Sequence, residues 1–122
     1  MTNRIREIKQ AQRASFLLHE IAQFFLQITI DDAELRGLYI NRVKLSSDNG
    51  LCYVLFIATN GKEEFDAKLS RLILFKPSLR SALSKVSHGR YVPDLIFKYD
   101  EEYEKQQKVE DLIDQLKREG KI

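Results

Sequence analysis

Basic side chains gather in the middle of this 122-residue chain. Between Lys68 and Lys98 there are seven lysines and arginines but only one acid, Asp94. From Tyr99 to the C-terminus the balance reverses, with eight acids against five bases. Clustered cations neutralise the phosphates of nucleic acids, so this asymmetry favours a polyanionic partner for the basic segment. A basic helix face that contacts only solvent is the alternative.

Two groups of residues are candidates for contacts with a nucleic acid. Cations of the first group would neutralise phosphates, and its serines would donate hydrogen bonds to phosphate oxygens or, in an RNA, to 2′-hydroxyl oxygens. Simple solvation of the serines stays open as the alternative. The first group contains Arg71, Lys76, Ser78, Arg80, Ser81, Ser84, Lys85 and Arg90. The second group, Arg42 and Lys44, lies on a predicted strand and has ordinary hairpin surface as its alternative.

Residues suited to catalysis or metal binding are few. The single cysteine, Cys52, excludes an internal disulfide and a cysteine-based zinc cluster, and its apolar surroundings predict a small buried side chain. The carboxylates of Asp31 and Asp32 have no His, Asp or Glu cluster at ligand spacing, so we expect them to cap a turn. The most economical catalytic site would use His88 with Asp94, but the chain has no Ser/His/Asp or Cys/His constellation and no phosphate loop. We predict a protein that is not an enzyme and has no metal or cofactor.

The composition is typical of one soluble globular domain, with 43% hydrophobic and 31% charged residues. No apolar run approaches the roughly 20 residues needed to span a membrane. The basic N-terminus is not followed by the apolar stretch of a signal peptide, so we predict a cytoplasmic protein.

Helical spacing of apolar residues marks three segments before the last strand. A first helix over 4–28 is expected to be deeply buried, with N-terminal turns that project beyond the core. A second is expected to begin at an N-cap on Asn60 with Glu63 in a capping box, and a third to end at Gly89 with His88 in its last turn. The predicted inward residues are Ala11, Ala14, Leu17, Leu18, Ile21, Phe24, Phe25, Ile28, Phe65, Leu69, Leu72, Ile73, Leu79, Ala82, Leu83 and Val86.

A proline interrupts the apolar pattern ILFKPSLRSAL at residues 73–83. In a helix interior, Pro77 would cost about 3 kcal/mol, because it lacks a backbone donor and clashes with the preceding turn. In the first turn of a helix the missing donor is harmless. The pattern therefore predicts two helices with a sharp joint at Phe75-Lys76-Pro77.

Strand signals lie on both sides of the second and third helices. Residues 38–46 alternate imperfectly, which a bulge near Asn41 would explain, and SSDNG predicts a hairpin with positive φ at Asn49-Gly50. The apolar run 51–59 is typical of a central strand, and 95–99 predicts a third strand. The remaining residues, 101–122, form a charged extension, partly helical or flexible, with an apolar stripe at Val109, Leu112, Ile113 and Leu116.

This α+β order of helix, strand, strand, helix, helix and strand resembles the type II KH domain, although the chain has no GXXG loop. A KH-like family without that loop, ribosome-binding factor A, is the closer resemblance. It rests on DDAELRGLYINRVKLSSDNGLCYVLF, on LRSALSKV and on RYVPDLIFKYDEEYEKQQKVEDLIDQL, and covers roughly residues 4–118 in order. The family typically has an Ala-x-Gly kink where this chain has Phe75-Lys76-Pro77.

The resemblance implies a KH-like RNA-binding domain over 1–100, with a three-stranded sheet packed on helices, followed by the extension 101–122. It implies a monomeric, non-catalytic factor that binds the small (30S) ribosomal subunit and its rRNA, assists late assembly and 16S rRNA 5′-end maturation, and is linked to growth at low temperature. A ribosome-associated GTPase that releases the factor is in keeping with the family. The alternative is a protein-interaction module that acts through its acidic C-terminal segment.

Overall fold

The computed structural model describes residues 2–121 and contains four α-helices, one short 3₁₀ helix and three strands. The predicted α+β order is confirmed, and the C-terminal extension adds one more helix. In chain order the elements are α1 (Thr2–Asp31), η1 (Ala33–Leu35), β1 (Leu38–Leu45), β2 (Leu51–Ala58), α2 (Lys62–Ile73), α3 (Lys76–Val86), β3 (Asp94–Tyr99) and α4 (Glu101–Arg118).

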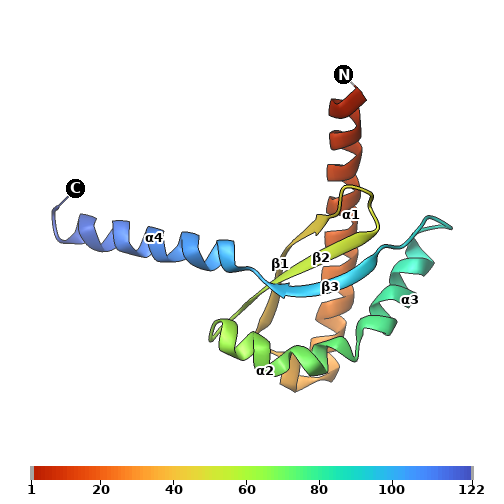
Figure 1. The fold of residues 1–122 in the computed structure, drawn as a ribbon. Coiled ribbons are helices and arrows are strands. Elements are labelled where there is room, and N and C mark those ends of the chain that lie inside the picture. The colour runs from red at the N-terminus through yellow and green to blue at the C-terminus, as the bar shows by residue number, and fades with distance from the viewer. Residues whose placement is uncertain (1, 122) are drawn as a thin grey trace.

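The strands form a mixed sheet in the order β1-β2-β3, so β2 is central as predicted (Figure 1). β1 runs antiparallel to β2, while β3 runs parallel to it after the crossover through α2 and α3. Alternate residues of β2, namely Cys52, Val54 and Phe56, are fully buried together with apolar residues of α1, α2 and α3. The core therefore lies between one face of the sheet and these three helices.

Phe56 lies at the centre of this core. Its ring centroid is 5.4 Å from that of Phe25 in α1, and 5.7 Å from those of Phe65 in α2 and Phe97 in β3. Aromatic rings at these separations make edge and tilted contacts that add to the free energy of burial. One side chain thus links the first helix, the second helix and the sheet.

The long first helix is less buried than the sequence predicts. Its core-facing residues are Leu17, Ile21 and Phe25, while Leu18 is only half-buried and Ala11 is exposed. Leu17, Ile21 and Phe25 are spaced four residues apart, so they lie on one narrow side of the helix. The side chains of residues 3–9 are exposed, which confirms that the N-terminal turns project beyond the core (Figure 1).

The irregularity of the first strand is a bulge, as predicted. Ile40 pairs with Phe56 and Arg42 with Leu55, so Asn41 is the additional residue. The bulge places Arg42 and Lys44 on the sheet face opposite the helices. In the hairpin that follows, positive φ is found at Asn49 (60°) but not at Gly50, so that prediction is right for the asparagine alone.

Three predictions about helix boundaries and faces are wrong. Gly61, not Asn60, is the N-cap of α2, and Glu64 rather than Glu63 reaches back and accepts a hydrogen bond from the Asn60 backbone N–H at 2.9 Å. α3 ends at Val86, and His88 (φ 52°) and Gly89 (φ 80°) lie in a turn beyond it. Ile73, the last residue of α2, is exposed because the chain turns away from the core there.

The joint between the middle helices is where the sequence predicts it. α2 ends before Leu74, α3 begins at Lys76, and Pro77 occupies the second helical position, where no backbone donor is needed. The helix is continued by a hydrogen bond from the Leu79 N–H to the Phe75 carbonyl at 3.0 Å. Pro77 therefore stabilises the start of α3 rather than breaking a longer helix.

Replacing Pro77 with glycine is expected to keep the fold. Glycine loses more backbone entropy in a helix, so the free energy of unfolding should fall by about 1–2 kcal/mol while unfolding stays cooperative. Chemical denaturation measures both quantities, and Pro77→Ala is the control for loss of the ring alone. Non-cooperative unfolding of Pro77→Gly would contradict the assignment of Pro77 to the start of α3.

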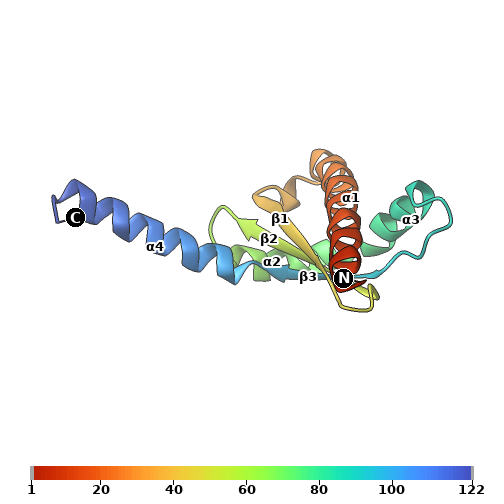
Figure 2. The same cartoon turned by 90° about the horizontal axis from the view of Figure 1, so that it is seen from above.

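The C-terminal extension is helical and has no buried residue in α4. Figures 1 and 2 both show this helix pointing away from the sheet and the other helices. The predicted apolar stripe is therefore largely exposed, at Val109, Leu112 and Ile113. The contacts that hold α4 to the domain lie at its first turn.

Candidate RNA-binding surface

The outward face of α3 carries the polar residues that the sequence predicts there. Ser78, Arg80, Ser81, Ser84 and Lys85 are all exposed. Leu79 and Leu83 on the opposite side are fully buried and fix the orientation of the helix. Packing of two leucines thus presents two cations and three hydroxyls to solvent.

A groove runs along this face, between α3 and α1. It is lined by Pro77, Ser78, Ser81 and Lys85 from α3 and by Phe24 from α1, among others. The ammonium group suits the phosphates of an RNA strand, the hydroxyls suit its ribose, and the aromatic ring suits a base. The groove therefore joins the polar side chains of α3 to Phe24 of α1 in one continuous surface.

Arg80 and Lys76 lie at the edges of this face. The Arg80 guanidinium is 4.0 Å from the Asp94 carboxylate, at the limit of an ion pair, and donates to the Val92 carbonyl at 3.4 Å. The ammonium of Lys76 lies 5.7 Å from the centre of the Phe97 ring, which leaves it half-buried over the core. Among the described residues, Lys76 has no carboxylate within ion-pair distance and Arg80 has only the distant Asp94, so both can contact a phosphate.

Arg71 is placed differently from these cations. Its Nε donates to Asp32 at 2.6 Å, and its Nη1 lies 3.2 Å from the carboxylate of Glu34. Asp32 is buried, and it also accepts from the Glu34 backbone N–H as the predicted cap of the acidic turn. Hydrogen bonding to Arg71 lowers the pKa of the Asp32 carboxyl. Arg71 therefore joins α2 to the segment after α1, and we leave it out of the proposed surface.

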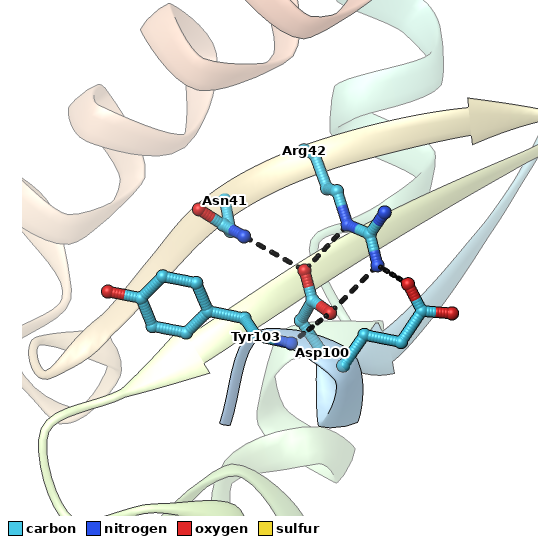
Figure 3. A network of polar contacts seen from close by, with 5 residues as sticks. Asn41, Arg42, Asp100 and Tyr103 are labelled. Carbon is cyan, nitrogen blue, oxygen red and sulfur yellow. Dashed lines mark hydrogen bonds and ion pairs between the residues drawn. The ribbon is translucent and has the colours of Figure 1, made fainter. Parts of the chain in front are cut away.

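Arg42 lies in a second polar network, shown in Figure 3. Its Nε donates to one carboxylate oxygen of Asp100 at 2.7 Å and its Nη2 to the other at 2.9 Å. Asn41, the additional residue of the bulge, donates a hydrogen bond from its side-chain amide to Asp100 at 2.8 Å. Asp100 also caps α4 by accepting from the Tyr103 N–H at 3.1 Å. One carboxylate thus joins β1 to the start of α4.

This network explains the charge states of its members. Asp100 is only 1% exposed, yet hydrogen bonds from Arg42 outweigh desolvation and lower its pKa to about 2. The same hydrogen bonds raise the pKa of Arg42. Since its fork is already filled by Asp100 and Glu102, we also leave Arg42 out of the proposed surface.

The other two predicted contacts lie away from the outer face of α3. Lys44 is exposed on β1, on the open side of the sheet and opposite Tyr53 of β2. Arg90 is exposed in the segment between α3 and β3, beyond the end of the helix. The structure therefore brings together Lys76, Ser78, Arg80, Ser84 and Lys85, and separates Lys44 from them.

One cation near Arg90 was not among the predicted contacts. Arg13 of α1 lines the same hollow as Arg90, although 77 positions separate the two in the sequence. Neither periodicity nor local composition signals a pair that depends on the way α1 packs against the end of α3.

Within residues 2–121, no three His, Cys, Asp or Glu side chains come together as a metal site would require.

Comparison with protein families gives one clear match. A family model described as Ribosome-binding factor A matches residues 9–113. Ribosome-binding factor A of Chromohalobacter salexigens is 30% identical over 113 residues, which cover 91% of this chain and 86% of that protein. Its counterpart in Thermomicrobium roseum is 31% identical over 111 residues, covering 91% and 85%.

Solved structures show the same fold. The crystal structure of ribosome-binding factor A from Thermus thermophilus superposes with a TM-score of 0.62 at 24% identity, covering 74% of this chain and 94% of that one. The solution structure of a Thermotoga maritima protein titled a putative ribosome binding factor A has a TM-score of 0.65 at 21% identity, covering 74% and 85%. These matches confirm the KH-like α+β fold.

The family consists of ribosome-binding factors rather than enzymes, which agrees with the prediction of a non-catalytic protein. The match spans the helices, the sheet and the joint described above, and it includes most of α4. The chain belongs to the ribosome-binding factor A family.

Proposed function

We propose that this protein binds the small ribosomal subunit through its rRNA and assists late assembly and maturation of the 16S rRNA 5′ end, without catalysis. Family membership supports the ribosome as the partner. The observation that carries the proposal is the outer face of α3, where Arg80 and Lys85 are exposed among three exposed serines. Cations with hydroxyls between them contact an RNA backbone by charge and by hydrogen bonds.

Recognition on this surface is directed at phosphates and ribose. In KH domains the joint between two helices approaches the nucleic acid backbone, and here the joint holds Phe75, Lys76 and Pro77. Pro77 cannot donate a backbone hydrogen bond there, so Lys76 provides charge in its place. Affinity should consequently depend on salt, with a log–log slope of about −0.7 to −0.9 for each phosphate contact.

The proposal extends to the setting of the protein. Residues 1–100 form the RNA-binding domain and 101–122 an extension of it, in a cytoplasmic monomer that supports growth at low temperature. A ribosome-associated GTPase is the proposed agent of its release from finished subunits. No helix among residues 2–121 is long and apolar enough to cross a membrane.

The second candidate, a protein-interaction module, is favoured by one feature, the exposed stripe of α4. A truncation that ends at Glu104 separates the two functions, because it keeps the Asp100 cap and Tyr103 but removes the stripe. The deleted residues carry five bases and four acids, so the charge of the protein hardly changes. Under the RNA-binding proposal, the truncated protein should bind small subunits about as tightly as the intact protein, within about twofold.

Equilibrium binding to purified small subunits measures this effect. The matched control is the full-length variant Leu112→Gln/Ile113→Gln, which keeps the helix and the net charge and makes the apolar face polar. If both variants lose subunit binding, α4 rather than α3 is the principal contact.

A further inference from the structure

A hollow beside the end of α3 has the composition of an anion site. It lies between α1 and the turn that follows α3, has a volume of about 690 Å³, and is lined by Lys9, Arg13, Phe16, Ser87, His88 and Arg90, among others. We propose that this hollow binds a phosphate group of the rRNA backbone through Arg13, Arg90 and the Ser87 hydroxyl. The inference rests on the proposed function, to which it adds a second contact beyond the outer face of α3.

The turn after α3 brings two of these residues to the same place. The Arg90 N–H donates to the Ser87 carbonyl at 3.1 Å, and the two residues between them, His88 and Gly89, both have positive φ. Positive φ at both central positions is typical of a type I′ turn, which reverses the chain within four residues. Ser87 and Arg90 are therefore close although the helix has already ended.

Arg13 is held at the hollow from the other side. Its Nη2 donates to the Tyr91 carbonyl at 3.0 Å, and its guanidinium lies 5.4 Å from the centre of the Phe16 ring. These contacts use one N–H group and one face of the guanidinium. A guanidinium has five N–H donors, so several remain for an anion.

The cations of the hollow are not neutralised by the protein. In the described part of the chain, no ion pair involves Lys9, Arg13 or Arg90, whereas Arg42 and Arg71 each contact two carboxylates. Burial, and after it the charge of Arg90, lower the pKa of Arg13. Like charges held together without a counter-ion create a local positive potential that an anion would relieve.

No acidic side chain of the described residues lines the proposed phosphate site, but two line an adjoining hollow that shares Lys9, Arg13 and Arg90 with it. There Asp48 accepts hydrogen bonds from Ser46 at 2.7 Å and from the Gly50 N–H at 2.9 Å, so it is engaged in its own hairpin. Glu7 is exposed on the projecting part of α1. The carboxylates therefore lie on the hairpin side of the cations, away from Ser87.

Ser87 supplies an independent reason to expect a ligand. The residue is 3% exposed, and its hydroxyl is the one buried side-chain polar group among residues 2–121 that has no hydrogen-bond partner. Buried polar groups are nearly always hydrogen-bonded, since an unmade hydrogen bond destabilises the fold. Ser87 also lines the hollow, so a phosphate oxygen seated there is an acceptor toward which the buried hydroxyl can turn.

The position of the hollow favours an RNA phosphodiester over a separate small anion. Val86 lines both this hollow and the groove along α3, so the two are neighbours on one surface. An RNA strand whose phosphates contact Lys85 in the groove can place another of its phosphates, farther along the strand, at Arg13 and Arg90. The RNA path would then run along α3 and end between α1 and the turn.

Replacing the exposed cation of the proposed site tests the inference. For Arg90→Gln, we expect about fivefold weaker binding to small subunits at 0.1 M salt and a salt slope smaller by about 0.7, the effect of one lost phosphate contact. Lys117→Gln removes the same charge from an exposed position of α4 and should change neither value. Equal affinity and slope for both variants would overturn the site.

Nuclear magnetic resonance tests this site independently of the proposed function as a whole. Backbone signals of residues 87–90 in the full-length protein should shift on titration with a short single-stranded RNA, and should not shift with the same sequence on an uncharged backbone. Ser87→Ala should reduce the shifts without unfolding the protein. Shifts with inorganic phosphate but not with RNA, or no shifts at all, would overturn the inference even if the intact protein sediments with small subunits.

Discussion

Replacing Arg80 and Lys85 with glutamate is expected to abolish binding to the small ribosomal subunit while the fold is kept. Loss of two phosphate contacts alone weakens binding by at least about 25-fold at 0.1 M salt, and the two new carboxylates repel the phosphates that the cations attracted. Both side chains are exposed, and Arg80 makes only long contacts with Asp94 and Val92. The free energy of unfolding should therefore change by no more than about 0.5 kcal/mol.

Sedimentation with purified subunits measures the loss, and chemical denaturation measures the stability. The matched control is Lys117→Glu/Arg118→Glu, which reverses the same charge at exposed positions of α4. The control should bind nearly as tightly as the unchanged protein. Retained binding by Arg80→Glu/Lys85→Glu would mean that the outer face of α3 is not the RNA surface.

The largest expected effect on stability comes from Asp100. Asp100→Ala removes the acceptor for Arg42, for Asn41 and for the first turn of α4 in a single change. The free energy of unfolding should fall by about 3 kcal/mol, since a half-buried guanidinium loses its buried carboxylate partner, Asn41 loses its acceptor and a helix loses its cap. Denaturant unfolding measures this loss, and Asp111→Ala, at an exposed position of α4, should be almost neutral.

The same residue makes stability depend on pH in the acid range. The pKa of Asp100 is about 2 in the fold against an ordinary value of 3.8, so the folded state favours the ionised carboxylate. A lowered pKa contributes stability above pH 4, here about 2 kcal/mol, which is lost as the pH falls from about 4 to about 2. Asp100→Asn should remove this part of the pH dependence, and an unchanged acid profile would contradict the assigned network.

Local features of the fold could be predicted because local residues cause them. Pro77 fixes its own φ and lacks a donor, so its place at the start of α3 follows from its chemistry. The bulge at Asn41 follows from a change in the phase of apolar residues on a single strand. The central position of β2 follows from its unbroken apolar run, because a strand with neighbours on both edges buries more of its side chains than an edge strand does.

Features that depend on distant segments could not be predicted in this way. Arg42 and Arg71 match the proposed RNA-binding cations in type, but their partners Asp100 and Asp32 lie 58 and 39 positions away. The approach of Arg13 to Arg90 depends in the same way on helix packing. Burial of α1 was overestimated because its apolar stripe is wide in sequence, while the sheet covers only the side that holds Leu17, Ile21 and Phe25.

The distribution of carboxylates separates the cations that join elements of the fold from those of the proposed RNA surface. Cations that meet carboxylates, at Asp32 and Asp100, connect elements of the fold. Cations without close carboxylates lie on α3, at the joint and beside the turn after α3, and these form the proposed RNA surface. α4 carries further charges of both signs and extends away from that surface (Figure 2).

The most direct test of this account is sedimentation of the purified protein with isolated small subunits at low and at moderate salt, with large subunits as the control. The account predicts binding to small subunits only, weakening as salt rises. Failure of the folded protein to bind small subunits, or equal binding to large ones, would contradict it and direct attention to a protein partner of α4.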